Sequence, residues 1–125
     1  MQLPLVFGAL FGLLAVVFGA FGAHALKNIL SEDQLKSFET GVKYQMYHAI
    51  LLLVLGFNFN QTNPLEKYII YCIIIGTFLF SFSIYGLILS SAKGKKMKFL
   101  GPITPLGGLL LVIGWMLLLY SFINA

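Results

Sequence analysis

Residues 3–26 read LPLVFGALFGLLAVVFGAFGAHAL and contain no charged side chain. A helix crosses the roughly 30 Å hydrocarbon core of a bilayer with about 20 apolar residues, so this stretch is long enough to span a membrane. Three more uncharged stretches follow at residues 44–65, 68–92 and 99–125. The pattern predicts an all-α fold, a bundle of four transmembrane helices. The predicted spans cover about residues 3–26, 44–58, 68–91 and 104–123.

The composition places the whole chain, residues 1–125, in a single integral membrane domain. Hydrophobic residues make up 59% of the sequence and charged residues only 10%, whereas soluble domains carry about 25% charged residues. The net charge of +4 sits between and beside the predicted spans, so it indicates topology and not a nucleic-acid-binding surface. No connection is long enough to fold as a soluble catalytic domain. The single Cys72 excludes an intramolecular disulfide and a cysteine metal cluster.

The lysines predict how the chain is oriented, because cytoplasmic loops of membrane proteins carry an excess of Lys and Arg. The first connection has Lys27, Lys36 and Lys43, the third has Lys93, Lys95, Lys96 and Lys98, and the middle one has only Lys67. The sequence therefore predicts a multi-pass protein of the cell membrane. Its first and third connections lie in the cytoplasm, and both termini lie outside.

Small residues recur along the first predicted span at alternating steps of four and three. Such a repeat of 3.5 residues places them on one face of the helix, where a neighbouring backbone can approach closely. We therefore predict a helix-packing seam there and a second region of close packing in the last span. The predicted packing residues are Gly8, Gly12, Ala15, Gly19 and Gly22 in the first span and Gly107, Gly108 and Gly114 in the last.

Residues 31–34, Ser-Glu-Asp-Gln, match a capping box, in which the serine and a glutamine three residues later bond each other's backbone amides. Leu35, Phe38 and Val42 then recur at helical spacing among charged residues. The sequence predicts a short amphipathic helix at the membrane interface between spans one and two. This helix either ends near Gly41 or continues into span two, and the sequence leaves both open.

Span two carries the most polar face of the predicted spans. At about 100° per residue, Tyr44, Gln45 and His48 fall within one arc. Polar groups are costly inside a membrane, so they mark structural hydrogen bonds or a binding site. His24 lies at a similar shallow depth, and Thr104 is placed to cap the last helix ahead of a proline. The candidate polar cluster is His24, Tyr44, Gln45, His48 and Thr104.

Three motifs occur in an order that resembles a known family. They are Gly19-Ala-Phe-Gly-Ala-His-Ala25, Phe38-x-x-Gly-Val-x-Tyr-Gln-x-x-His-Ala49 and Gly101-Pro-x-Thr-Pro-Leu-Gly-Gly108, followed by Gly114-Trp115. Over nearly its whole length the chain resembles the small four-span membrane proteins of the domain-of-unknown-function 423 family, relatives of transmembrane protein 256. The resemblance implies an integral membrane protein and brings with it no established biochemical activity.

The favoured function is a helix-packing or scaffold module that acts with a membrane partner, either another membrane protein or a second copy of the chain. Hydrogen bonds from the polar cluster would then fix helix register at about 0.6–2 kcal/mol each. The first alternative is binding of a lipid or another small anionic or hydrophobic ligand at the cytoplasmic face. Anionic headgroups would there meet Lys93, Lys95, Lys96 and Lys98 beside the start of the last helix.

Three further classes find less support. Haem or metal ligation would use His24 and His48 as an axial pair, but the helical wheel turns His24 about 160° away from the packing seam. Proton-coupled transport lacks an intramembrane carboxylate, and catalysis lacks a nucleophile beside a base. The sequence therefore predicts a protein that is not an enzyme, needs no cofactor and binds no nucleic acid, with membrane lipids among its partners.

Overall fold

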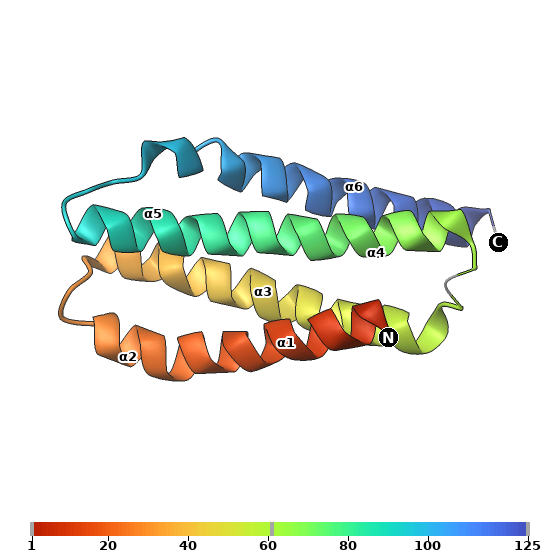
Figure 1. Ribbon diagram of the computed structural model, residues 1–125, viewed down its shortest axis with the longest axis horizontal. Coiled ribbons are helices and arrows are strands. Elements are labelled where there is room, and N and C mark those ends of the chain that lie inside the picture. Colours follow the sequence, from red (N-terminus) through yellow and green to blue (C-terminus); the bar gives the residue numbers. More distant parts are fainter. Residues whose placement is uncertain (1, 61, 125) are drawn as a thin grey trace.

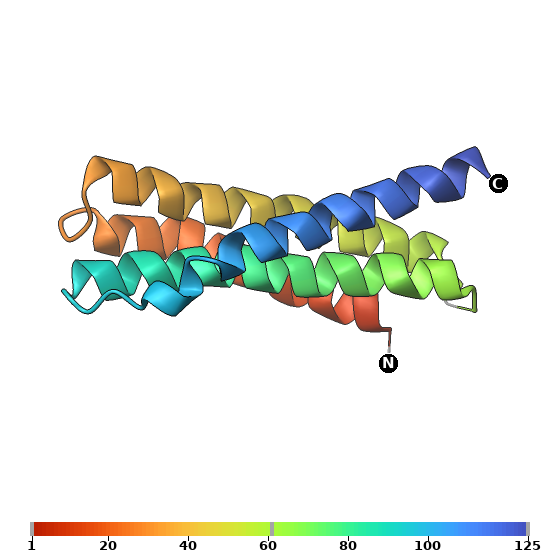
Figure 2. The ribbon, with the colours of Figure 1, turned by 90° about the horizontal axis from the view of Figure 1, so that it is seen from above.

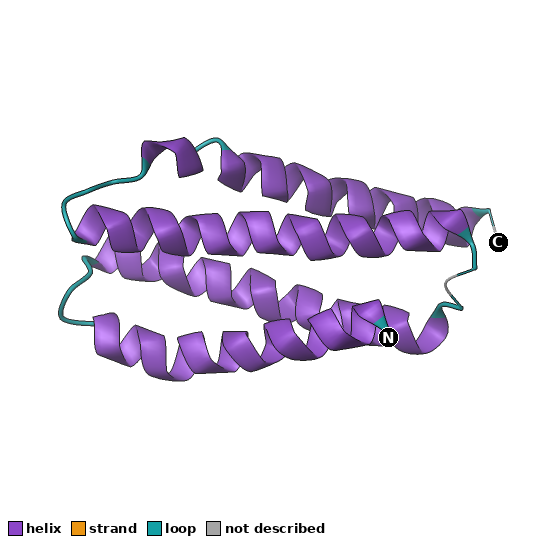
Figure 3. Cartoon of the chain, in the orientation of Figure 1, coloured by secondary structure: helices purple, strands orange, loops and turns teal. Residues whose placement is uncertain are grey.

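The structure, a computed structural model, describes residues 2–60 and 62–124. Within these residues every regular element is a helix (Figure 1 and Figure 3). The first helical segment joins α1 (Leu3–Val17), the π-helical η1 (Phe18–Gly22) and α2 (Ala23–Leu26), and the second is α3 (Glu32–Asn58). The third joins α4 (Pro64–Thr77), the π-helical η2 (Phe78–Phe82) and α5 (Ser83–Ala92). The 3₁₀ turn η3 (Lys98–Leu100) then leads into α6 (Ile103–Ile123).

Of the two courses left open for the helix that begins at the capping box, the structure shows the one that continues into the second predicted span. The capping box is present, since the Gln34 N–H donates to Ser31 Oγ over 3.2 Å and the Ser31 N–H donates to Gln34 Oε1 over 3.0 Å. The helix that begins there does not end near Gly41 but continues to Asn58. Gly41 is buried, and an added Cβ would lie 2.8 Å from Cε1 of Tyr85. The glycine therefore permits a close helix contact and does not end the helix.

Three of the four helical segments are long and apolar enough to cross a membrane, namely Leu3–Leu26, Pro64–Ala92 and Lys98–Ile123. α3 differs because its first half carries most of the acidic residues of the chain together with Lys36 and Lys43. It nevertheless runs alongside the other segments in both views (Figure 1 and Figure 2). The predicted second span corresponds to the second half of this helix.

The helices form two close pairs, α1 with α3 and α4 with α6 (Figure 1). The segments η2 and α5 lie against α3 and join the pairs, while α6 crosses the bundle obliquely (Figure 2). The core between the pairs buries large apolar side chains from every segment, among them Phe11, Leu52, Ile73 and Leu111. The bundle is thus held by apolar packing along its length, and its polar side chains lie within that packing.

Both lysine-rich connections lie at one end of the bundle, and the two chain ends and the α3–α4 connection lie toward the other (Figure 1). We call the first of these the lysine end; it consists of residues 27–31 and 93–98. A second apolar cluster of Leu30, Phe38, Tyr85 and Ile88 lies beneath it. The clustering of the five lysines of residues 27–31 and 93–98 at one end follows directly from the antiparallel course of the helices.

The small residues of the first segment face α3. A Cβ on Gly8 would lie 3.0 Å from the backbone oxygen of Ala49, and one on Gly19 would lie 3.2 Å from Val42 Cγ1. Gly12 is less tightly packed, because its added Cβ would be 3.8 Å from the Cβ of Ala49. The two remaining positions also contribute, since Ala15 is buried and a Cβ on Gly22 would lie 3.2 Å from the ring of Phe38.

Two of the three predicted glycines in the last span let α6 touch its neighbours. A Cβ on Gly107 would meet the backbone nitrogen of Phe80 and lie 2.8 Å from its Cα. A Cβ on Gly114 would lie 2.8 Å from Cδ1 of Ile73. Gly108 is different, because its nearest neighbour would be the Phe80 ring at an ordinary 3.6 Å.

Candidate functional site

Gln45 lies in the middle of α3 and is 0% exposed, at the place where α3 meets α1 and α5. Its Nε2 donates to the backbone oxygen of Phe11 over 2.8 Å, and its Oε1 accepts from the Tyr85 hydroxyl over 2.7 Å. An unpaired amide in an apolar interior costs a few kcal/mol, so these two bonds are what make the buried position tolerable. We call these three residues the Gln45 network, and it ties three helices together.

His48 lies one turn further along α3 and has both ring nitrogens engaged. Nδ1 is 2.7 Å from the backbone oxygen of Tyr44, and Nε1–H of Trp115 in α6 donates to Nε2 over 3.0 Å. An indole N–H can only donate and a carbonyl can only accept, so Nε2 carries the lone pair and Nδ1 carries the proton. His48 is therefore a neutral imidazole that links α3 to α6.

A polar stripe on the third segment faces α3. Ser81 donates from Oγ to the backbone oxygen of Gly41 over 2.7 Å, one turn before the Tyr85 hydroxyl of the Gln45 network. Thr77 lies one turn earlier still and is fully buried, and its Oγ1 is the buried side-chain polar atom without a hydrogen-bond partner in the described part of the chain. The sequence analysis missed these residues, although Thr77, Ser81 and Tyr85 follow one another at steps of four, which is a readable helical signal.

Thr104 does not cap the last helix as predicted. α6 begins at Ile103 with Pro102 at the cap position, and no side chain caps it. The Thr104 hydroxyl instead lies 2.5 Å from the hydroxyl of Ser83, which itself donates to the backbone oxygen of Phe80 over 3.0 Å. Because Ser83 has a single hydroxyl proton, Thr104 is the donor in this pair. The pair joins α6 to the start of α5.

The five residues predicted as one polar cluster do not form one site. Gln45 and His48 belong to separate hydrogen-bond networks on α3. Tyr44 is 42% exposed. The centroid of its ring lies 5.0 Å from that of the Phe80 ring and 6.3 Å from that of the His48 imidazole. The His24 side chain is exposed on α2 and makes no hydrogen bond or ring contact with the other described residues. The structure therefore brings Tyr44 and His48 together and leaves the other three residues in separate surroundings.

The four lysines at the third connection are all exposed. The chain turns back after α5 at Gly94, whose φ of +77° is readily adopted only by glycine. Ser90 holds the turn, because its backbone oxygen accepts from the Lys95 N–H over 3.0 Å and its hydroxyl accepts from the Met97 N–H over 3.1 Å. Lys96 and Lys98 line a pocket beside this turn, and the other two lysines do not.

Metal or haem ligation has little geometric support. Across residues 2–60 and 62–124 no group of three or more His, Cys, Asp or Glu side chains could hold a metal ion. Neither nitrogen of His48 is free, so an axial bond would require the loss of the bond to Trp115 or to the Tyr44 backbone.

Comparisons with known proteins confirm the family resemblance that the three motifs indicate. A family model described as "Protein of unknown function (DUF423)" matches residues 18–108, a range that contains the three motifs quoted above. A UPF0382 membrane protein of Staphylococcus aureus (strain bovine RF122 / ET3-1) is 40% identical over 97% of this chain and 95% of its own length. A UPF0382 membrane protein of Staphylococcus haemolyticus (strain JCSC1435) is 37% identical over the same shares. No solved structure matches the chain.

Proposed function

The chain belongs to the DUF423 family, whose relatives named above are membrane proteins, and we propose that it serves as a helix-packing scaffold for a membrane-protein partner. The observation that supports this most is that four buried polar side chains, those of Gln45, His48, Ser81 and Ser83, bond to other helices of the same chain. Gln45 joins α3 to α1 and α5, and His48 joins α3 to α6. Interhelical bonds of this kind fix the register of membrane helices.

Catalysis and proton-coupled transport have less support. Within the described residues the hydroxyls of Ser81 and Ser83 bond to backbone oxygens or to Thr104, and no hydroxyl pairs with His48. A nucleophile beside a base is therefore not among the observed contacts. The acidic residues of α3 are exposed in its first half and do not lie within the buried networks.

We assign the partner surface to the outer face of α6. Gly107 and Gly114 turn one side of this helix toward η2 and α4, and the other side carries large exposed side chains. Trp115 lies near the middle of α6 and is 48% exposed, whereas tryptophan in membrane proteins concentrates at the interfaces with water. Its N–H is already bonded to His48, so the exposed ring surface is suited to packing against a further helix.

Native mass spectrometry of gently extracted protein tests this role. The chain is expected to carry the added mass of a second protein molecule, either another copy or a different membrane protein. Met116→Trp on the outer face of α6 should lower that fraction at least about fivefold, because a bulky ring in a helix interface costs about 1–3 kcal/mol. Leu13→Trp on α1 is the matched control, since Met116 is 62% and Leu13 is 61% exposed. A chain without added protein mass, or an equal loss in both variants, would contradict the proposal.

We further propose that α3 crosses the membrane with the other three segments and that the lysine end is cytoplasmic, because lysines concentrate on the cytoplasmic side. In a Cys72→Ser background, Asn28→Cys and Thr62→Cys then lie on opposite sides of the membrane. Thr62→Cys is expected to react with a membrane-impermeant maleimide in intact cells, and Asn28→Cys only after permeabilisation. Equal reactivity would mean that α3 does not cross, and the reverse pattern would invert the orientation.

A further inference from the structure

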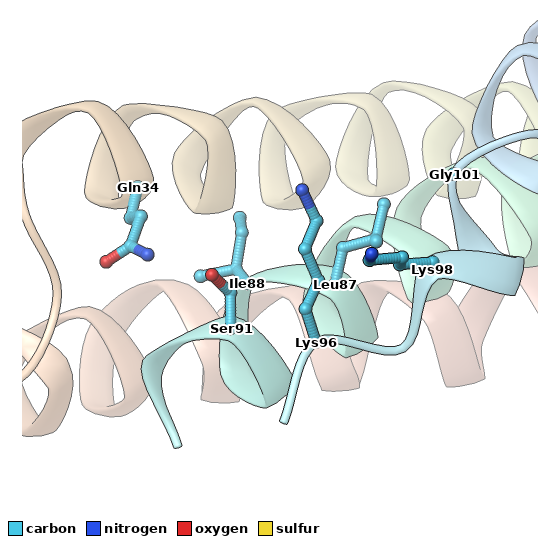
Figure 4. A pocket seen from close by; sticks show the side chains of 7 residues that line it. All are labelled: Gln34, Leu87, Ile88, Ser91, Lys96, Lys98 and Gly101. Atoms are coloured by element: carbon cyan, nitrogen blue, oxygen red, sulfur yellow. The ribbon is translucent and has the colours of Figure 1, made fainter. Parts of the chain in front are cut away.

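A pocket of ≈ 390 Å³ opens at the lysine end, between the start of α3, the last turns of α5 and the connection to α6 (Figure 4). Lys96, Lys98 and Gly101 are exposed at its edge, while Ile88 is buried and Leu87 half-buried. The residues that line it are Gln34, Leu87, Ile88, Ser91, Lys96, Lys98 and Gly101. The pocket thus combines an apolar surface on α5 with a polar, basic edge.

The polar groups of this pocket are suited to an anion. Lys96 and Lys98 contribute two ammonium groups, and no acidic residue lines the pocket. Neither lysine forms an ion pair with a described residue, and the Ser91 hydroxyl has no hydrogen-bond partner there. Ammonium groups can only donate hydrogen bonds, so they favour a ligand that is negatively charged and accepts them.

The capping box of α3 leaves one further hydrogen-bond donor for a ligand in the pocket. Because Gln34 Oε1 accepts from the Ser31 N–H over 3.0 Å, the amide nitrogen Nε2 is the end of this side chain that remains for a ligand. The side chain extends from α3 toward Ile88 and Ser91 in Figure 4. The same residue therefore both starts the helix and adds a donor to the pocket.

The backbone that carries the lysines is held in place. The turn at Gly94 and the bond from the Met97 N–H to Ser90 Oγ bring residues 95–98 back over the end of α5. Ser90 Oγ also donates to the backbone oxygen of Leu87 over 3.1 Å, which anchors this contact to the helix. A held loop loses less conformational entropy when a ligand binds.

We propose that this pocket binds the phosphate of an anionic lipid headgroup. The apolar surface of Leu87 and Ile88 continues into the membrane-spanning part of α5, so an acyl chain can follow the helix while the phosphate meets the two lysines, Ser91 and Gln34. Inorganic phosphate shares the chemistry of the headgroup, and the experiment below separates the two sources.

The test compares two pairs of lysines in the same connection. Lys96→Gln/Lys98→Gln removes the lysines that line the pocket, and Lys93→Gln/Lys95→Gln removes the same charge from lysines that do not. The probe is phosphatidylglycerol titrated into the detergent-solubilised full chain and counted by native mass spectrometry, with phosphatidylcholine as the neutral lipid. The pocket variant is expected to bind phosphatidylglycerol at least about tenfold more weakly than the wild type, because it loses two charge-assisted hydrogen bonds.

Each outcome of this test decides for or against the pocket. The affinity of the Lys93→Gln/Lys95→Gln variant for phosphatidylglycerol should stay within about threefold of the wild type. Its two lysines would act on the lipid only through long-range attraction, which salt screens. Ser91→Ala keeps every charge and should weaken binding by about threefold, which corresponds to one hydrogen bond. If phosphatidylglycerol stays bound in millimolar inorganic phosphate, the pocket is a site for the lipid headgroup. If inorganic phosphate displaces the lipid, the pocket is a site for free phosphate. Equal losses from both lysine pairs, or equal binding of phosphatidylcholine, overturn the proposal.

The four lysines are exposed, and Ser91 is half-buried but loses only a hydroxyl without a partner, so the variants are expected to fold. Circular dichroism and the thermal unfolding midpoint of each variant check this expectation. If the pocket variant alone unfolds, a Lys96→Arg/Lys98→Arg variant restores both charges, and it must then bind phosphatidylglycerol within about threefold of the wild type. Failure of this variant to bind while folded would also overturn the proposal.

Discussion

Gly107→Ala is expected to lower the free energy of unfolding by about 3 kcal/mol, the upper end of the usual cost of overpacking. The added Cβ would meet the backbone nitrogen of Phe80, 2.8 Å from its Cα and 2.9 Å from the backbone oxygen of Gly76. These atoms belong to the backbones of η2 and α4, so no side-chain rotation can relieve the contact. α6 would have to move away from the third segment, and the packing of Leu111 against Gly76 would be lost with it.

Gly108→Ala is the matched control for this prediction. The nearest atom to its added Cβ would be Cδ1 of Phe80 at 3.6 Å, an ordinary contact distance, so we expect a change within about 0.5 kcal/mol. Both variants place the same methyl group in the same helix turn. Reversible unfolding in mixed detergent micelles, followed by circular dichroism, gives the two free energies. Equal destabilisation by the two substitutions would show that α6 does not pack on η2 through Gly107.

Gln45→Leu is the second substitution with a large expected effect, about 3 kcal/mol of lost stability. The leucine fills a similar volume but removes the bonds to the Phe11 oxygen and to the Tyr85 hydroxyl. The Tyr85 hydroxyl loses its buried acceptor, which costs about 1–3 kcal/mol, and the lost bond to the Phe11 oxygen, which keeps its helical bond within α1, adds about 0.5–1.5 kcal/mol. Tyr85→Phe removes only the second of these bonds and should cost about half as much. The same unfolding measurement in micelles provides both values.

The helical fold could largely be predicted from the sequence, because the length of an uncharged apolar run is itself the requirement for a membrane span. The last helix begins at Ile103, next to the predicted position 104, and the capping box correctly marks the start of α3. The continuity of α3 through Gly41 could not be predicted. It depends on the ring of Tyr85, which reaches that glycine only after the third segment has packed against α3.

The polar residues of the candidate site could be predicted, but most of their partners could not. Gln45 and His48 stand out as polar side chains in an apolar stretch, yet Gln45 donates to the backbone oxygen of Phe11, and a backbone oxygen leaves no mark in a sequence. The partner of His48, the N–H of Trp115, belongs to a residue 67 positions further along the chain. The residues that line the pocket at the lysine end come from segments that are distant in the sequence, so no local sequence pattern predicts it.

The central claim, that the polar side chains within the bundle serve helix packing, is tested most directly by a double-mutant cycle of Gln45→Leu and Tyr85→Phe. If the two side chains bond to each other, the double variant leaves neither partner unpaired, and its loss of stability should fall short of the sum of the single losses by at least about 1 kcal/mol. Gln45→Leu combined with Tyr44→Phe is the control and should be additive, because the bond recorded for Tyr44 involves only its backbone oxygen. Additive losses for Gln45→Leu and Tyr85→Phe would contradict the claim.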